Sequence, residues 1–329
     1  MSLTNDQIIA QIEAAYTDLT SGQTKLIALQ SALSAPVLTP PPTTMADLKG
    51  ANVYAITGVN GLEALKTATG ATHVRCEYGL GSQSAFITEA RRLGMKVTMI
   101  ACYSSGYAAT SHQPPDPQYY GAWSDKMVAP LKNNLDVFEA IACWNEPFMP
   151  GFWLNPNPTL YHALCRALLP KVRAISTSLP FVFCSDDHIF GDPLNSGTWQ
   201  NPLLAADSAN GNVLRNDPYT RPETHNYCQS DPPDAPRYAD HFDRYKLAHD
   251  AWLRKVWVTE YGWDTFGGSE TSPVSEATQA DYTSRALNMM LGSKMVERAH
   301  VYQWKADDWY GLRRPDGSNR PVCGTILNL

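Results

Sequence analysis

The chain has 329 residues, of which 43% are hydrophobic and 18% charged, and its formal net charge is −6. This length and balance suit one large α/β domain, or two smaller ones, with a sizeable buried core. The sequence holds no dense field of lysine and arginine, so nucleic acid is excluded as the main partner, because phosphate binding requires such a field.

The cysteines and the N-terminal residues give information about the cellular compartment in which the protein is made. Seven cysteines are present, an odd number, and most lie in apolar runs such as those around Cys102 and Cys184. Buried thiols and synthesis in a reducing compartment therefore fit better than a disulfide framework. The first residues lack the basic start and apolar core of a signal peptide, and no apolar stretch is long enough to span a membrane. The localisation of the protein stays open.

The N-terminal segment is predicted to be separate from the rest. Residues 4–34 favour one helix, with capping residues at Thr4 to Asp6 and apolar residues at the spacing of a short coiled coil. Gly22 weakens this seam, so a helix packed on the following domain is an equal alternative. We expect a helix over residues 1–35 that attaches the chain to a homo-oligomer or particle, and a proline-rich linker over 36–48.

From about residue 50, short apolar runs alternate with helical stretches. Strands are predicted at 52–56, 73–78, 96–103, 137–144, 181–185, 224–228, 256–261 and 299–304. Helices between them include 82–93, 159–177, 238–255 and 276–291. Eight strands buried on both faces predict an α/β fold, a (β/α)8 TIM barrel over residues 49–329. Few residues follow the last strand, so the eighth helix is expected to be short or replaced. The competing doubly wound sheet lacks its third glycine after Gly79 and Gly81.

Two glutamates follow strands of the predicted barrel. Active sites of such barrels lie at the carboxyl ends of the strands. The fourth strand ends in Trp144-Asn145-Glu146-Pro147, and the seventh ends in Glu260-Tyr261-Gly262-Trp263. Cleavage of a glycosidic bond needs two carboxyl groups, about 5–5.5 Å apart for retention and about 6.5–9.5 Å apart for inversion.

These two motifs together resemble clan A of the retaining glycoside hydrolases. The resemblance covers residues 50 to about 320 and rests on Asn145-Glu146-Pro147 and on Thr259-Glu260-Tyr261-Gly262. It implies a (β/α)8 barrel in which Glu146 is the general acid/base and Glu260 the nucleophile. It also implies a poly- or oligosaccharide substrate and no cofactor.

The resemblance extends to five further residues at strand ends. Arg75 matches the arginine that keeps the nucleophile ionised, as a guanidinium beside a carboxylate does. His225 and Tyr227 resemble the His-x-Tyr motif, whose tyrosine hydrogen-bonds the nucleophile. Asn145 matches the residue that binds the sugar 2-hydroxyl, and Trp304 matches the aromatic floor under the sugar. Structural roles at the barrel mouth remain the alternative for Arg75, His225 and Tyr227.

Three loop tryptophans, Trp153, Trp263 and Trp309, follow the fourth, seventh and eighth strands. They are candidates for sugar-stacking platforms, and the alternative is that they cover the barrel rim. Asp186, Asp187 and His188 follow the fifth strand and are candidates for binding sugar hydroxyls or a cation.

Metal and serine-esterase chemistry lack their usual signals. His73-x-x-Cys76 and His225-x-x-Cys228 lie in predicted strands, where residues three apart point to opposite faces. No tetrahedral metal cluster is therefore indicated, and no Gly-x-Ser-x-Gly motif is present.

The leading hypothesis is retaining hydrolysis of a glycoside, with transglycosylation as a variant that the same residues permit. A non-catalytic carbohydrate-binding barrel, displayed on a larger assembly by its N-terminal helix, is the alternative from another class. Substrate choice depends on loops, and segments 104–118 and 186–222 are expected to build the cleft.

Overall fold

The computed structural model describes residues 43–53, 61–77, 83–102, 104–108, 113–185, 199–228, 230–235, 242–267, 272–305 and 309–329. The chain divides into two units, Met1–Pro42 and Thr43–Leu329. The predicted N-terminal helix, most of the linker and residues 186–188 lie outside the described residues, so those predictions stay untested.

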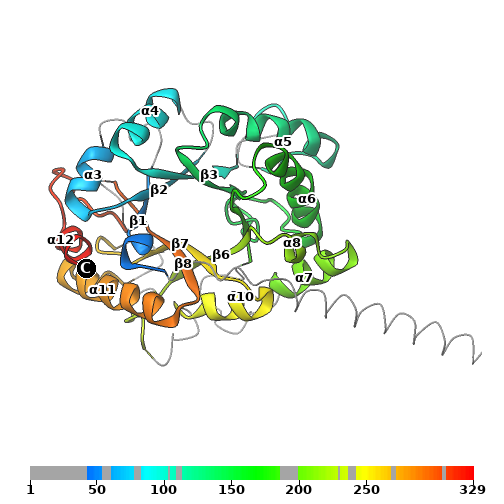
Figure 1. The fold of residues 1–329 in the computed structure, drawn as a ribbon. Coiled ribbons are helices and arrows are strands. Elements are labelled where there is room, and N and C mark those ends of the chain that lie inside the picture. The colour runs from blue at the N-terminus through cyan, green and yellow to red at the C-terminus, as the bar shows by residue number, and fades with distance from the viewer. Residues whose placement is uncertain are drawn as a thin grey trace, which may run out of the picture. The chain divides into compact units, whose positions relative to one another are not determined.

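Residues of the second unit form a closed barrel of eight parallel strands, which confirms the predicted fold. Each strand pairs with the next one along the chain, and β1 pairs with β8 (Figure 1). The strands are β1 (Gly50–Asn52), β2 (His73–Glu77), β3 (Lys96–Ala101), β4 (Phe138–Cys143), β5 (Phe181–Cys184), β6 (Thr220–Tyr227), β7 (Val256–Gly262) and β8 (Val296–Val301).

Helices surround the strands as an outer ring (Figure 1). They are α3 (Leu62–Thr69), α4 (Gln83–Leu93), α5 (Tyr120–Val128), α6 (Pro158–Ile175), α7 (Gln200–Ala209), α8 (Val213–Asn216), α10 (Arg244–Trp252), α11 (Glu276–Ser293) and α12 (Pro321–Asn328). Short 3-10 helices lie at η1 (Met45–Leu48), η2 (Pro117–Tyr119) and η3 (Ala129–Asn133). The last helix, α12, is short, as the sequence predicts, and packs between α11 and α3.

Two strands begin earlier than their apolar runs predict. β6 begins at Thr220 and β8 at Val296, and β8 ends at Val301. The missed residues include charged side chains, which an apolar pattern does not find. Nε of Arg221 in β6 donates to Oε2 of Glu297 in β8 over 2.5 Å, so the two opposite charges are paired although β7 lies between their strands.

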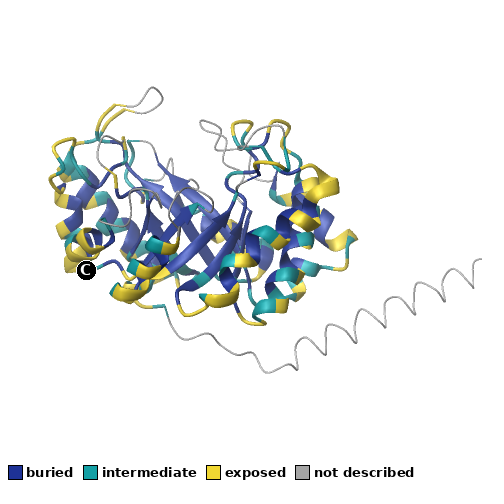
Figure 2. Ribbon diagram, turned by 90° about the horizontal axis from the view of Figure 1, so that it is seen from above, coloured by how far each residue is buried: buried dark blue, intermediate teal, exposed yellow. Residues whose placement is uncertain are grey.

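The apolar core has two parts. The larger part joins the strands to the helices around them, and Figure 2 shows the strands buried at the centre with exposed residues on the outer sides of the helices. The smaller part consists of strand residues alone, as expected for side chains that point into the barrel: Ala140, Ala142, Val182 and Trp257. Because the two alanines are small, room remains inside the barrel for larger polar side chains.

The segment before β1 belongs to the barrel unit, although the sequence placed it at the end of the linker. The Thr43 hydroxyl donates to the carbonyl of Val296 over 2.9 Å, and Asp47 pairs with Arg298 at 2.8 Å. Gly50 then starts β1 at a point where no side chain fits. A Cβ there would clash with the His73 ring and lie 2.5 Å from the carbonyl oxygen of Ala299.

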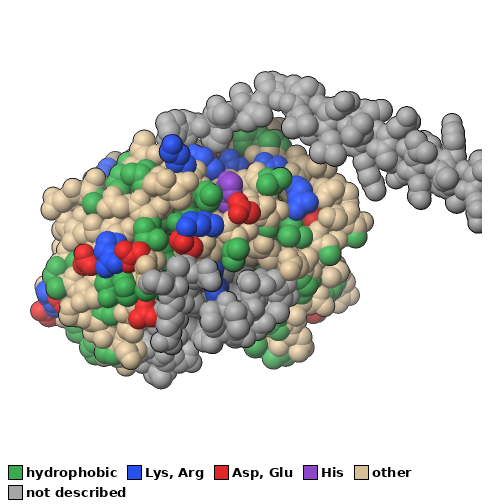
Figure 3. Space-filling view, turned by 90° about the horizontal axis from the view of Figure 1, so that it is seen from below, with side chains coloured by type: hydrophobic (Ala, Val, Ile, Leu, Met, Phe, Trp, Pro, Cys, Tyr) green, Lys and Arg blue, Asp and Glu red, His purple; other side chains and the backbone are tan. Residues whose placement is uncertain are grey.

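The outer surface carries mixed charges. Figure 3 shows one face, on which basic side chains lie among acidic ones rather than in a broad field of one sign. No helix in the described part of the chain is long and apolar enough to cross a membrane.

Candidate active site

The backbone around Glu146 has an unusual conformation. φ is 66° at Trp144 and 42° at Glu146, both in the left-handed region that side chains other than glycine disfavour. Such residues cost about 1–3 kcal/mol each and persist where the surrounding structure holds them. Here the indole N–H of Trp144 donates to the carbonyl of Phe152, and the N–H of Met149 donates to the carbonyl of Glu146. The turn after β4 therefore fixes the direction in which Glu146 points.

A register shift brings Glu260 to the inner side of the barrel. β6 and β7 shift between Thr224 and His225, so that His225 pairs with Glu260 rather than with Thr259. In a regular strand, Trp257 and Glu260 would point to opposite faces, because they are three residues apart. The shift lets both side chains point inward and places Glu260 beside His225.

Glu146 and Glu260 lie close together at the barrel mouth. The Nδ1 atom of His225 is 2.8 Å from Oε1 of Glu146 and 3.6 Å from Oε2 of Glu260. One carboxylate oxygen of each glutamate and this imidazole nitrogen all lie within 4.8 Å of one another. The two glutamates singled out from the sequence therefore share one site.

Both oxygens of Glu260 receive hydrogen bonds. Nη1 of Arg75 donates to Oε1 over 2.7 Å, and the hydroxyl of Tyr227 donates to Oε2 over 2.8 Å. Arg75 is itself held by two amides, since Nη2 donates to Oδ1 of Asn145 and Nη1 donates to Oδ1 of Asn52. The structure thus brings Arg75, Asn145 and Tyr227 together around Glu260, as the resemblance implies.

The surroundings move the pKa values of the two glutamates in opposite directions. Burial raises the pKa of Glu146, and the charge of Glu260 acts in the same direction, while His225 and Arg75 oppose both. Burial acts to raise the pKa of Glu260 too. The charges of His225 and Arg75, with hydrogen bonds from Tyr227 and Arg75, outweigh it, so that the pKa of Glu260 is lowered. The carboxyl group whose pKa is raised therefore lies beside the one whose pKa is lowered.

His225 couples the two carboxylates. Burial lowers the pKa of its imidazole, but the charge of Glu260 and the hydrogen bond and charge of Glu146 outweigh burial and raise it to about 9. The pKa of Glu146 is raised as well, so the pair keeps at least one proton at neutral pH. Titration of this proton belongs to the pair rather than to either residue alone.

Sequence reasoning missed several members of the site. Asn52 ends β1, and its Nδ2 donates to the carbonyl of Thr259 over 2.9 Å while its oxygen accepts from Arg75. Glu223 is fully buried in β6, 3.7 Å from Nη2 of Arg75. Asn52 was predicted to begin its strand, whereas β1 ends there, so the sequence placed this residue at the wrong end of the strand. Glu223 left no signal, because it lies before the apolar run by which its strand was predicted.

Two aromatic residues missed by the sequence surround Tyr227. Its ring centroid lies 5.0 Å from that of Tyr310 and 6.3 Å from that of Tyr302. These rings fix the phenol that donates to Glu260.

Trp153 and Trp263 are not exposed platforms, which corrects the expectation for both. Trp153 is 4% exposed and packs edge-on against Trp144 and Tyr161. Trp263 is fully buried, stacks on Phe242 and donates from its indole to the carbonyl of Asp231. Large rings after strands four and seven are here used to pack the loops onto the barrel.

The other two tryptophans have different surroundings. Trp309 is 47% exposed, and its carbonyl accepts from the N–H of Thr265, which ties the loops after β7 and β8 together. Trp304 is 7% exposed, and its backbone N–H donates to the carbonyl of Asn52. It therefore lies on the rim beside the residue whose side chain accepts from Arg75. The guanidinium of Arg313 lies 5.3 Å from its ring centroid.

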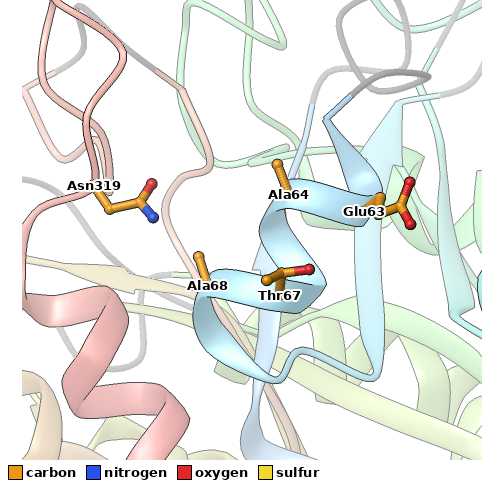
Figure 4. A pocket seen from close by; sticks show the side chains of 5 residues that line it. All are labelled: Glu63, Ala64, Thr67, Ala68 and Asn319. Atoms are coloured by element: carbon orange, nitrogen blue, oxygen red, sulfur yellow. The ribbon is translucent and has the colours of Figure 1, made fainter.

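A shallow pocket of about 430 Å³ lies elsewhere, on the outer surface. It is lined by one face of α3 and by Asn319: Glu63, Ala64, Thr67, Ala68 and Asn319 (Figure 4). Helix α3 is part of the outer ring, so this pocket includes none of the residues that converge at the strand ends.

Comparisons with known proteins agree with the barrel. No family model matches the chain, and no curated protein matches it significantly. Among solved structures, the GH39 enzyme from Xanthomonas axonopodis pv. citri has a TM-score of 0.65 at 13% identity, covering 88% of this chain and 67% of that one. A glucosidase from Croceicoccus marinus has a TM-score of 0.63 at 14% identity, covering 88% and 68%.

A third neighbour is shorter. The GH128 (subgroup I) endo-β-1,3-glucanase from Amycolatopsis mediterranei, solved with laminaritriose, has a TM-score of 0.55 at 16% identity and covers 86% of this chain and 99% of that one. Identities this low show the fold alone. The chain is thus similar in fold to these glycoside hydrolases and has a closed barrel of eight parallel strands.

Proposed function

We propose that this protein is a retaining glycoside hydrolase that cleaves a poly- or oligosaccharide by double displacement. The observation that carries the proposal is the pair of carboxyl groups at the barrel mouth. Glu146 and Glu260 approach within 4.8 Å, and their pKa values are displaced in opposite directions. A general acid and a nucleophile require two carboxyl groups whose pKa values are pushed apart by their surroundings.

Each step follows from these protonation states. Glu260, ionised between Arg75 and Tyr227, attacks the anomeric carbon while Glu146 gives its proton to the departing oxygen. Glu146, now a carboxylate, takes a proton from water, and the hydroxide displaces Glu260 from the sugar. Free water enters and the free sugar leaves, so the enzyme returns to its starting charge.

The separation of the carboxylates favours retention over inversion. An inverting enzyme holds a water between its two carboxyl groups, which sets them about 6.5–9.5 Å apart. One oxygen of Glu146 lies within 4.8 Å of one oxygen of Glu260, and so close an approach supports direct attack by Glu260. The amide N–H groups of Asn145, whose oxygen accepts from Arg75, are available for the sugar 2-hydroxyl. Trp304 is assigned the floor under the sugar.

The substrate class is tested with a polysaccharide panel. It includes β-1,3-glucan and xylan, because the solved neighbours include proteins named as an endo-β-1,3-glucanase and a β-xylosidase. Products are identified by mass spectrometry, and the anomer formed first is identified by proton NMR. We expect retention of configuration. Predominant transfer to a second sugar would identify the transglycosylase variant of the same mechanism.

Two isosteric variants separate the roles. Glu260→Gln removes the nucleophile and should reduce turnover of every substrate at least about 10⁴-fold. Glu146→Gln should abolish cleavage of natural glycans but retain the first step with an aryl glycoside whose leaving group needs no proton. Glu63→Gln on the exterior helix α3 is the matched control. Full activity of Glu260→Gln, with the fold intact, would disprove the mechanism.

A further inference from the structure

A third carboxylate, Glu223, lies inside the barrel next to the catalytic groups. Its side chain is fully buried, and Oε2 is 3.7 Å from Nη2 of Arg75. We propose that Glu223 is a positioning residue that acts through Arg75: it remains the counter-ion of the guanidinium while the charge of Glu260 is consumed in the covalent intermediate. This inference rests on the proposed double displacement and assigns a role to a residue that takes no direct part in it.

One strand, β6, directs three side chains toward the catalytic groups. Glu223, His225 and Tyr227 alternate along it, and alternate residues of a strand point to the same face. The second and third of them contact the two catalytic carboxylates. The first faces the guanidinium of Arg75 from deeper in the barrel. The position of Glu223 thus belongs to the same series as two residues of the site.

Glu223 is held by charge rather than by hydrogen bonds. Among the described residues, neither of its carboxylate oxygens has a hydrogen-bond partner, and the cation that pairs with it is Arg75. Its charge also acts on Cys143, at the end of β4, and on Tyr161 of α6. Burial, with the charge of Glu223 acting in the same direction, holds the pKa of both groups well above their ordinary values, so that both stay neutral. The charge that Glu223 balances is therefore that of Arg75.

Arg75 is a buried cation that depends on its two carboxylates. It is 1% exposed, and burial acts to lower the pKa of its guanidinium. The charges of Glu223 and Glu260 oppose burial, and the pKa is raised. The other acceptors of Arg75 are the neutral amide oxygens of Asn52 and Asn145. Breaking up a buried ion pair leaves an uncompensated charge, so the guanidinium requires an anion at every stage of the reaction.

Double displacement removes the charge of Glu260. In the first step an oxygen of Glu260 forms a bond to the anomeric carbon, and the bond from that carbon to the departing oxygen breaks. The electron pair of the broken bond stays on the departing oxygen, which takes the proton of Glu146. Glu260 becomes a neutral ester, and the negative charge passes to Glu146. Glu223 is then the anion that remains paired with Arg75, and it lowers the energy of the intermediate and of the transition state before it.

Removing the charge of Glu223 has an effect with a defined sign. In Glu223→Gln the positive charge of Arg75 acts on Glu260 alone, which favours the carboxylate and lowers the pKa of Glu260 further. The acid limb of the kcat/KM profile should therefore move to lower pH, while kcat falls because the carboxylate is harder to convert into an ester. The other titratable groups around Arg75 are unchanged in this variant: Cys76 of β2, Cys102 after β3, Glu146 after β4, His225 of β6 and His300 of β8.

The first experiment measures the pKa of Glu260 in the full chain, by carbon NMR of isotope-labelled glutamate side chains, with Glu260→Gln to assign the signal. Glu223→Gln should lower this pKa. Glu297→Gln is the matched control and should leave it unchanged, because Glu297 of β8 also pairs with an arginine but with Arg221 rather than Arg75. An unchanged or raised pKa of Glu260 in Glu223→Gln would overturn the proposal. This measurement does not depend on glycoside hydrolysis.

The second experiment tests the covalent step, with an aryl glycoside of the sugar that the polysaccharide panel identifies. Glu223→Gln should lower kcat about 10- to 100-fold. It should slow formation of the glycosyl-enzyme more than its hydrolysis, so that mass spectrometry after rapid quenching detects less covalent enzyme. Glu223→Asp, which retains the charge, should restore most of the activity. More covalent enzyme in Glu223→Gln than in the wild type would contradict the role.

A further variant separates charge from folding. Glu223→Met replaces the carboxyl group by an apolar group of similar length, and it provides the same comparison if Glu223→Gln does not fold. A loss of packing alone would lower activity without moving the acid limb to lower pH. If the wild type cleaves no glycoside, the proposed function fails, whereas a lowered pKa of Glu260 in Glu223→Gln still identifies Glu223 as the counter-ion of Arg75.

Discussion

Nδ1 of His225 lies 2.8 Å from Oε1 of Glu146, so the carboxyl group proposed as the acid shares a proton with a buried imidazole. This contact sets the expected pH dependence of activity. Activity should fall at low pH as Glu260 gains a proton, below its ordinary pKa of 4.5, because its pKa is lowered. It should fall at high pH as Glu146 loses its proton, above 4.5, because that pKa is raised.

Replacing His225 should move the whole pH profile. His225 lowers the pKa of Glu146 and of Glu260, so His225→Gln should raise both and shift both limbs of the kcat/KM profile to higher pH. Loss of the positioning hydrogen bond should reduce kcat about 10-fold. A structural role alone would lower activity without moving the limbs. His249→Gln, in the outer helix α10, is the control and should move neither limb.

Tyr227→Phe tests the hydrogen bond to the nucleophile. The phenol donates to Oε2 of Glu260 over 2.8 Å, and this bond helps to lower the pKa of the carboxylate. Its removal should reduce kcat/KM by about 10- to 100-fold and shift the acid limb alone to higher pH. Tyr119→Phe, at an exposed tyrosine, should change neither. An acid limb that moves to lower pH would contradict the assignment.

The sequence predicted the barrel and its two glutamates because both leave local signals. Apolar runs mark strands buried on both faces, and Glu146 and Glu260 follow or end such runs. Glu223 left no such signal, because it lies before the run by which its strand was predicted. The pairing of His225 with Glu260 depends on a register shift between Thr224 and His225, which no spacing in the sequence reveals.

The surroundings of aromatic side chains are also not predicted by the sequence. Trp263 and Trp309 both lie in loops after late strands, and composition does not separate a ring that packs from one that remains exposed. Only the packing of Trp263 against Phe242, and the 47% exposure of Trp309, distinguish them.

This difference in burial predicts that only one of two substitutions destabilises the fold. Trp263→Ala should destabilise the fold by about 3–5 kcal/mol, because it empties a buried site, and urea unfolding measures the loss. Trp309→Ala should leave stability within about 0.5 kcal/mol. If Trp309 stacks on the glycan, the same change should raise KM for a long substrate with little effect on kcat. Equal stability of the two variants would contradict the burial argument.

Deleting residues 1–42 tests the predicted attachment segment. The unit Thr43–Leu329 has its own closed barrel and core, so the shortened chain should fold and retain activity on a soluble oligosaccharide. If the N-terminal segment oligomerises, the mass measured by light scattering should fall to that of one barrel. An unchanged oligomeric mass would rule out that role.

Gly50 offers a test of the tight packing at the start of β1. At Gly50, β1 pairs with β2 at His73 and with β8 at His300. A Cβ added to Gly50 would lie 2.5 Å from the carbonyl oxygen of Ala299. Because this neighbour is backbone in the barrel wall, it cannot shift without disturbing the strand pairing, and Gly50→Ala should cost about 1–3 kcal/mol of stability.

Gly121→Ala is the matched control, since that glycine lies in α5 with open space around the added methyl group. It should stabilise the protein by about 0.5–1 kcal/mol through helix propensity. Urea unfolding of both variants therefore separates a steric requirement from a general effect of replacing glycine, and equal shifts of the same sign would refute the close approach of β1 to β8.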